Sequence, residues 1–277
     1  MRSLKLFSPK LSFPDVNVDF LKSYEKWLLS KDKSITTVSI YIRSLRSILN
    51  IAIADGAINK ELNYPFGKRK YQIPASRNIK KALTLDEIGK IFRYEAIAGS
   101  WWEKARDFFI FSYLGNGINV KDISLLKFRN TDGEYIRFSR AKTINTNRAG
   151  MPISIYISAE MRAIIERWKN NGNNPDTFLF PILEPDLTPE RERVIVQQFI
   201  KMVNKYIRLI AKEVGIDKPI TTYYARHSFA TILRHSGAST ELISESLGHS
   251  SLKTTYSYLD SFEDEKKKEI LTALTNF

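Results

Sequence analysis

A polar, basic segment early in the chain divides the sequence into two parts. Residues 74–81 read PASRNIKK, and their few apolar residues fit neither a helical nor a strand period. Just beyond them, Thr84 and Glu87 have the spacing of a capping box, which marks the start of a helix. Such a segment is typical of a linker between domains. We therefore expect a first domain at 1–73, a linker at 74–83 and a second domain at 84–277.

The absence of cysteine excludes disulfide frameworks, thiolate nucleophiles and Cys-ligated zinc. The chain has three histidines, and no pattern of several His ligands, so we expect no metal and no other cofactor. No apolar run reaches the roughly 18 residues that a membrane span needs. We expect a cytosolic protein that does not associate with membranes.

The charge balance indicates a polyanionic partner. The chain carries 43 Lys and Arg against 30 Asp and Glu, a formal net charge of +13. Nucleic acid is the simplest partner for such a surplus, although many basic proteins bind no nucleic acid. Charge alone leaves both interpretations open.

The first part has the pattern of a small helical domain. Apolar residues at helical spacing predict helices over 16–30 and from Ser34, as the N-cap, to Gly56. The segment 63–71 contains Pro and Gly and cannot form one regular helix. Basic residues off the apolar faces are candidates for phosphate contacts, with a solvated surface as the alternative for each. These candidates are Arg43, Arg46, Lys68, Arg69 and Lys70.

The second part predicts a mainly α-helical domain with a small antiparallel β-sheet. A hairpin is expected from Phe128, through the turn at Asp132-Gly133, to Tyr135–Phe138, with a third strand at Met151–Ile157. The expected helices are 85–94, 101–114, 159–169, 189–214, 224–236, 240–247 and 251–260. The tail ends in an apolar pattern formed by Ile270, Leu271, Leu274 and Phe277.

The residues that carry chemistry lie between 221 and 260. Arg226 opens a helix, His249 follows a Leu-Gly pair, and Tyr258 stands nine residues after that histidine. A guanidinium clamps phosphate oxygens bidentately, and an imidazole hydrogen-bonds the same phosphate or moves a proton near neutral pH. A phenol attacks phosphorus once its proton is removed or shared. Surrounding positive charge would stabilise the pentavalent phosphorane.

This stretch resembles the tyrosine recombinases, or phage-type integrases. The resemblance rests on Arg-His-Ser-Phe-Ala-Thr at 226–231, Leu-Gly-His-Ser-Ser at 247–251, Thr254-Thr255, and the tyrosine nine residues past the histidine. It extends over nearly the whole chain and implies a SAM-like helical core-binding domain followed by an α+β catalytic domain. The two domains would form a C-shaped clamp around duplex DNA. The motif at 64–67, Tyr-Pro-Phe-Gly, is similar to integrases of mobile elements from Bacteroides-like bacteria.

The resemblance also implies a role for each matching residue. Tyr258 would form a 3′-phosphotyrosyl bond to DNA, Arg226 would clamp the phosphate, and His249 would contact the scissile phosphate. Lys142 would protonate the leaving 5′-oxygen, and Asp122 would support the site. The phosphodiester energy stays in the protein–DNA bond, so neither ATP nor metal is needed. Each residue also has a structural alternative, and Tyr256 is the rival nucleophile.

Two positions depart from the family pattern. Asn119 stands where the family has its first arginine, and Tyr223 stands where it commonly has histidine. A neutral amide cannot replace a bidentate cation. Arg140 lies two residues before Lys142, on the same side of an expected strand, so we hypothesise that it supplies the missing charge. Arg148 is the alternative.

The resemblance implies a site-specific recombinase that integrates or excises a mobile element in the bacterial cytoplasm, at the nucleoid. Four protomers would assemble on two DNA sites, with the apolar tail docked on a neighbour and accessory DNA-bending proteins as further partners. Packing of the tail within its own chain is the alternative. The rival functions are a catalytically impaired DNA-binding protein and a resolvase or inversion recombinase. The residues before the first expected helix are too few for the arm-binding domain that element integrases often carry.

Overall fold

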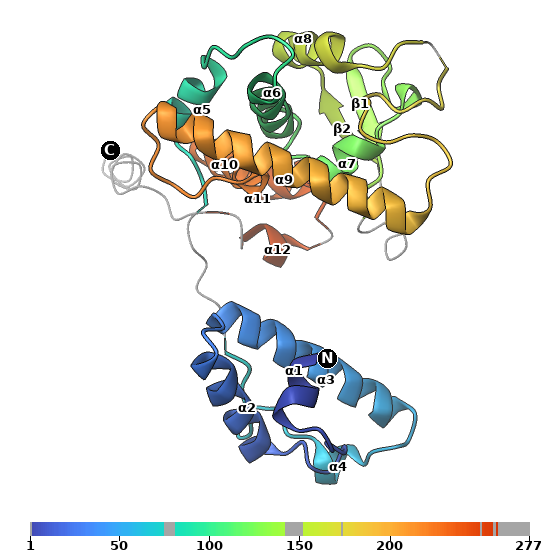
Figure 1. Ribbon diagram of the computed structural model, residues 1–277, viewed down its shortest axis with the longest axis vertical. Helices are drawn as coiled ribbons and strands as arrows, with labels where there is room; N and C mark the ends of the chain where they lie inside the picture. The colour runs from blue at the N-terminus through green and yellow to red at the C-terminus, as the bar shows by residue number, and fades with distance from the viewer. Residues whose placement is uncertain are drawn as a thin grey trace, which may run out of the picture. The chain divides into compact units, whose positions relative to one another are not determined.

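The chain forms two compact units, residues 1–79 and 80–277. The computed structural model is drawn in Figure 1. The residues that it describes are 2–74, 81–141, 152–172, 174–249, 251–256 and 259. No helix in these ranges is long and apolar enough to cross a membrane.

The first unit is a small helical domain built on two packed helices. Its helices are α1 (Arg2–Phe7), α2 (Val18–Ser30), α3 (Ile35–Ala54) and α4 (Lys60–Asn63). Asn17 and Ser34 cap α2 and α3, each accepting a backbone N–H of the first turn. The apolar faces of α2 and α3 form a common core with Leu21, Tyr24, Leu28, Val38, Ile42, Leu45 and Leu49.

Helix α1 was not expected from the sequence. It has only six residues, too few for the repeating apolar pattern by which a helix is recognised. Its place comes from tertiary contacts: Leu4 is buried, Phe7 packs against the core, and the Ser3 hydroxyl lies 2.6 Å from the Tyr24 hydroxyl.

The second unit is mainly helical and is arranged around α6. Its first elements are α5 (Leu85–Phe92), α6 (Trp101–Leu114), α7 (Val120–Leu125), the 3-10 helix η1 (Phe128–Asn130), β1 (Tyr135–Phe138) and β2 (Ile153–Tyr156). The remaining elements are α8 (Ala159–Trp168), α9 (Pro189–Glu213), α10 (Thr222–His235), α11 (Thr240–Ser246) and α12 (Leu252–Tyr256). Helix α6 packs against α5, α7, α8, α9 and α10, which explains why nearly all its faces are apolar or buried (Figure 1).

The described sheet has two strands. β1 and β2 pair antiparallel, with Tyr135 opposite Tyr156 and Phe138 opposite Ile153. Ile136 and Phe138 point into the core, and Arg137 between them is exposed, as the strand period requires. The expected strand at Phe128 is wrong: residues 128–130 form the 3-10 helix η1, because the Asn130 side chain accepts the Lys127 backbone N–H and closes a turn. The expectation of a mainly α-helical protein with a small antiparallel sheet is confirmed.

The capping box at the start of α5 is present. The Thr84 hydroxyl accepts the Glu87 backbone N–H, and the Glu87 carboxylate accepts that of Thr84. The Glu87 carboxylate also accepts a hydrogen bond from the Lys218 ammonium at 2.6 Å. One residue earlier, the Leu83 N–H donates to the buried Ser228 hydroxyl at 2.8 Å, so the segment leading into α5 is fixed to α10.

Candidate active site

Arg226 lies at the centre of the candidate site. It sits in the first half of α10 with only 2% of its side chain exposed. Its Nη1 donates to the Gly117 carbonyl at 2.8 Å, and its Nη2 donates to the Leu247 carbonyl at 2.6 Å. Both acceptors are neutral main-chain groups, so they orient the guanidinium without cancelling its charge.

Gly117 is required by this arrangement. Its φ of +63° is disfavoured for residues with a side chain, and a Cβ there would lie 2.8 Å from Arg226 Cα. The loop between α6 and α7 therefore touches the backbone of α10 directly. This contact brings the Gly117 carbonyl within reach of the guanidinium.

His249 contacts Arg226 from the turn after α11. Its Nε2 lies 3.0 Å from Arg226 Nη2, and its Nδ1 lies 3.0 Å from the Thr255 hydroxyl. Gly248, with φ +62°, allows the turn: a Cβ there would lie 2.3 Å from the Ile153 side chain. The sequence-predicted Arg226 and His249 are therefore in direct contact.

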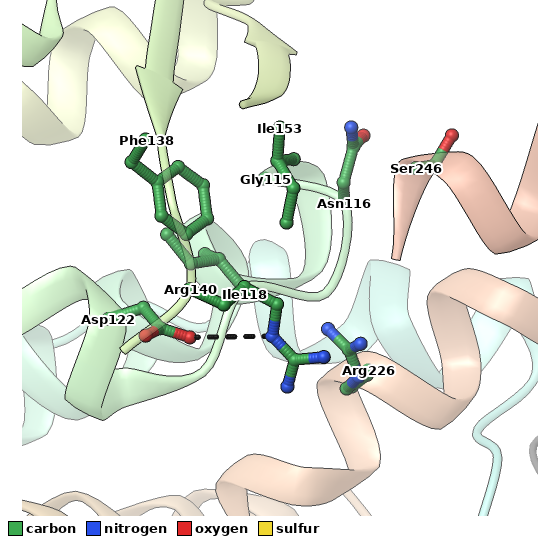
Figure 2. Close-up of a pocket in the computed structure, with 9 residues that line it drawn as sticks. All are labelled: Gly115, Asn116, Ile118, Asp122, Phe138, Arg140, Ile153, Arg226 and Ser246. Atoms are coloured by element: carbon green, nitrogen blue, oxygen red, sulfur yellow. Dashed lines mark ion pairs between the residues drawn. The ribbon is translucent and has the colours of Figure 1, made fainter. Parts of the chain in front are cut away.

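Arg140 reaches the same place from the end of β1. Its Nη1 lies 3.5 Å from the Leu247 carbonyl, the oxygen that Arg226 also contacts. Its Nε lies 3.9 Å from Asp122, whose other oxygen accepts the Ala141 backbone N–H at 3.0 Å. Figure 2 shows the two guanidinium groups together, with the Arg140–Asp122 ion pair as a dashed line.

The route by which Arg140 reaches the site differs from the expected one. β1 ends at Phe138, so strand parity between 140 and 142 does not apply. Arg140 is held by its ion pair with Asp122 and by its approach to Leu247. The approach to Leu247 joins positions 107 residues apart, and neither contact has a signal in the local sequence.

The surrounding pocket is small and carries a surplus of positive charge. It is lined by Gly115, Asn116, Ile118, Asp122, Phe138, Arg140, Ile153, Arg226 and Ser246. Two guanidiniums and one carboxylate are among its described lining residues, so cationic side chains outnumber anionic ones there. Such a site favours an anion with several oxygens, because guanidinium donors match phosphate geometry.

Asn119 and Tyr223, the two departures from the family pattern, have contacts of their own. Asn119 precedes α7 as its N-cap residue, and its side chain makes no capping hydrogen bond. Tyr223 has 38% of its side chain exposed. Its ring packs edge-on against His227 at 4.7 Å between centroids, and the Lys81 ammonium lies 5.6 Å from the ring centre.

Several predicted residues lie outside the described part of the structure. Tyr258, Lys142 and the alternative Arg148 are among them, as is the tail from residue 260 onward. Their roles stay predictions. The rival nucleophile Tyr256 is described: it ends α12 with 58% of its side chain exposed.

Sequence reasoning missed Thr255 and the backbone of Gly117 and Leu247. The only local signals were the adjacent threonines at 254 and 255 and the glycine before α7. The Gly117 and Leu247 carbonyls meet Arg226 through the tertiary fold, and the Thr255 contact with His249 depends on the turn between α11 and α12.

The DNA-contact candidates of the first unit are exposed. They are Arg43 and Arg46 on α3, and Lys68, Arg69 and Lys70 beyond α4. Lys70 differs from the others, because its ammonium donates to the Tyr64 carbonyl at 2.6 Å. Within the described ranges, no group of three or more His, Asp or Glu side chains could hold a metal ion.

Two family patterns match the chain. The pattern of the phage integrase family matches residues 105–265, and that of the phage integrase SAM-like domain matches residues 1–73. Among curated proteins, tyrosine recombinase XerD of Listeria monocytogenes serotype 4b is 26% identical over 231 residues, covering 82% of this chain and 72% of the relative. Tyrosine recombinase XerA of Pyrococcus horikoshii is 28% identical over 242 residues, covering 87% and 74%.

Solved structures share the fold at low sequence identity. The Tn1549 transposon integrase in complex with transposon right end DNA matches with a TM-score of 0.65 and 16% identity, over 99% of this chain and 91% of the other. The site-specific recombinase XerH bound to palindromic difH substrate, in a post-cleavage complex, matches with a TM-score of 0.66 and 16% identity, over 99% and 76%.

Proposed function

Because this chain belongs to the phage integrase family, the tyrosine recombinases, we propose that it cuts and rejoins double-stranded DNA at specific sites through a 3′-phosphotyrosyl intermediate. The observation that carries the proposal is the buried Arg226, which neutral carbonyl groups hold in contact with His249. A buried cation oriented by neutral groups is suited to one phosphate of a DNA strand.

The chemistry is an exchange of phosphodiesters. The Tyr258 phenol gives up its proton to solvent as its oxygen attacks phosphorus, the bond to the 5′-oxygen breaks, and Lys142 supplies the proton that the 5′-oxygen takes. The products are a 3′-phosphotyrosyl bond and a free 5′-hydroxyl. A 5′-hydroxyl from the partner strand then attacks the phosphotyrosyl group, which restores the phenol and a phosphodiester.

The described residues would stabilise the charge that develops during this exchange. Arg226 and His249 would contact the non-bridging oxygens of the scissile phosphate, where negative charge accumulates. Asp122 would hold the segment at 140–141, through its ion pair with Arg140 and its contact with the Ala141 N–H. Tyr223, one helical turn before Arg226, would offer a phenolic donor in place of the usual histidine.

Arg140 would supply the cation that Asn119 lacks. Two contacts support this assignment: Arg140 approaches the carbonyl group that orients Arg226, and both guanidiniums line one pocket. The pairing with Asp122 offsets part of the cost of burying Arg140. The alternative, Arg148, is outside the described residues.

The first unit would bind the DNA flanking the cleaved phosphate. The exposed basic residues Arg43, Arg46, Lys68, Arg69 and Lys70 would contact phosphates and give salt-sensitive, sequence-independent affinity. The linker would let the two units close around the duplex.

The assembly would be a tetramer on two DNA sites in the cytoplasm of a bacterium, with the apolar tail of each protomer docked on its neighbour. A lambda integrase dimer has been solved on its core site, which supports assembly on DNA. The motif at 64–67 supports a mobile element of the Bacteroides-like type. Such an element would be integrated and excised by this recombinase, with accessory DNA-bending proteins as further partners.

A second candidate function is favoured by Asn119. With a neutral side chain in place of the first arginine, the chain would bind DNA without cutting it. A nicked suicide substrate separates the two. We expect nicked duplexes tiled across the DNA that flanks the gene to yield a covalent protein–DNA adduct, and Tyr258→Phe to yield none.

The outcomes distinguish the functions. Absence of any adduct, with retained DNA binding, would support the binding protein. An adduct that persists in Tyr258→Phe and disappears in Tyr256→Phe would assign the nucleophile to Tyr256. Intermolecular products would separate integration from resolution or inversion within one molecule.

A further inference from the structure

Thr255 is a polar side chain with no exposed surface, and it is the only buried residue of α12. Its hydroxyl lies 3.0 Å from His249 Nδ1. A buried hydroxyl is normally retained with a hydrogen-bond partner, because leaving it unpaired costs free energy. The contact also joins α12 to the turn that holds His249.

The contacts of His249 select one form of its ring. The Arg226 guanidinium has N–H donors and no acceptor, so the His249 Nε2, at 3.0 Å from Arg226 Nη2, must accept. A neutral imidazole that accepts at Nε2 carries its proton on Nδ1. That proton points at the Thr255 oxygen, which accepts it. In the opposite tautomer, the Nε2–H would point at an Arg226 N–H, so two donors would face each other without an acceptor.

We propose that Thr255 is a positioning residue that holds His249 in the Nδ1-protonated form, with the Nε2 lone pair directed at Arg226. The proposal rests on the proposed recombinase function and deepens it. Any proton that His249 accepts then arrives at Nε2, and the resulting imidazolium presents an Nε2–H donor to a phosphate oxygen. Thr255 would act through His249 without touching DNA.

The ring form can be measured without any DNA substrate. The chain has three histidines, so a long-range nitrogen–proton NMR spectrum of histidine-labelled protein contains three ring patterns. His249→Gln identifies the pattern of His249. We expect the wild-type protein to show His249 protonated at Nδ1, Thr255→Ser to preserve this pattern, and Thr255→Val to change it.

Thr254→Val is the matched control, because Thr254 is the neighbouring threonine on the exposed side of α12. It should leave the His249 pattern unchanged. The melting temperature of each variant, measured alongside, shows whether the variant is folded. If Thr255→Val does not fold, the Thr255→Ser variant and the wild-type spectrum still test the proposal.

Cleavage gives the second readout. On the nicked suicide duplexes, we expect Thr255→Val to form the adduct about tenfold more slowly, the equivalent of one hydrogen bond, and Thr255→Ser to approach the wild-type rate. The proposal is overturned by wild-type His249 protonated at Nε2, by an unchanged ring pattern in folded Thr255→Val, or by slow cleavage in Thr255→Ser. A wild-type protein with the expected ring pattern but no adduct would contradict the recombinase function and leave the ring assignment intact.

Discussion

Two guanidinium clusters in the second unit differ in how their charges are balanced. The α6–α8 cluster consists of Glu103, Arg106, Asp107, Arg167 and Trp168. The Asp107 carboxylate accepts hydrogen bonds from Arg106 Nε at 2.9 Å and from the Trp168 indole N–H at 2.7 Å. It also accepts a hydrogen bond from Arg167. Two carboxylates there face two guanidiniums.

The candidate site also combines guanidiniums with a carboxylate, but in a different ratio. Among the described residues, Arg140 and Arg226 line a pocket with the single carboxylate of Asp122, and Arg226 donates to the Gly117 and Leu247 carbonyl oxygens. Burying a charge is costly unless it is paired. The α6–α8 cluster therefore matches each guanidinium with a carboxylate, while the described groups of the site hold two guanidiniums and one carboxylate, a composition suited to an anion.

The largest effect is expected from changing Arg226. Arg226→Lys keeps one charge but loses the bidentate geometry, so adduct formation should fall by about 100- to 1000-fold. Single-turnover cleavage of the suicide duplex, with circular dichroism to verify folding, measures this. Cleavage close to the wild-type rate would show that the guanidinium is structural, like those of the α6–α8 cluster.

Asp107→Asn should lower stability and leave cleavage intact, the reverse of the effect expected for Arg226→Lys. Removing one carboxylate leaves Arg106 and Arg167 with an incomplete set of partners, so the free energy of unfolding should fall by about 3 kcal/mol. Urea unfolding measures the loss, and cleavage at a temperature where the variant is folded should be retained. A variant of wild-type stability would contradict the contrast between the two clusters.

Arg140→Ala tests whether the site has a second working cation. We expect adduct formation to slow by about 10- to 100-fold, with partial recovery in Arg140→Lys. Lys121→Ala is the control, since Lys121 is an exposed basic residue next to Asp122. Equal rates in Arg140→Ala and Lys121→Ala would remove Arg140 from the mechanism.

The smallest effect is expected at the α5 N-terminus. Burial alone would raise the pKa of Glu87, but the Lys218 ammonium and the Thr84 contacts lower that pKa below its ordinary value. A carboxyl whose pKa is lowered by folding stabilises the protein above its unfolded pKa, and this contribution is lost as pH falls through the folded pKa.

Glu87→Gln should therefore lower the free energy of unfolding by about 1 kcal/mol at pH 7. The difference from wild type should narrow as the pH falls below the ordinary carboxyl pKa. Paired urea titrations at neutral and acidic pH measure the difference. A gap that widens in acid would show that Glu87 contributes through something other than its charge.

Local signals explain how much of the fold was predictable. The helix expected at 101–114 matches α6, and the capping box predicted the start of α5. These signals act within one helical turn. Phe128 was misassigned because its apolar side chain suits a strand, whereas the Asn130–Lys127 contact closes a 3-10 turn.

The site was predictable in its parts and less so in its connections. Arg226 and His249 were found from motif spacing. The approach of Arg226 and Arg140 to the Leu247 carbonyl depends on how distant segments pack, and the Thr255 contact with His249 depends on how α12 lies against the turn after α11. No periodicity along the chain carries that information, so residue types could be predicted while their hydrogen bonds could not.

The close contact at Gly117 has a consequence for position 119. The loop before α7 is fixed to α10 by backbone proximity and by the Arg226–Gly117 hydrogen bond, without help from the Asn119 side chain. The backbone at 119 is thus set independently of the residue that occupies it. Position 119 should therefore accept a longer basic side chain without a change in the backbone of the loop.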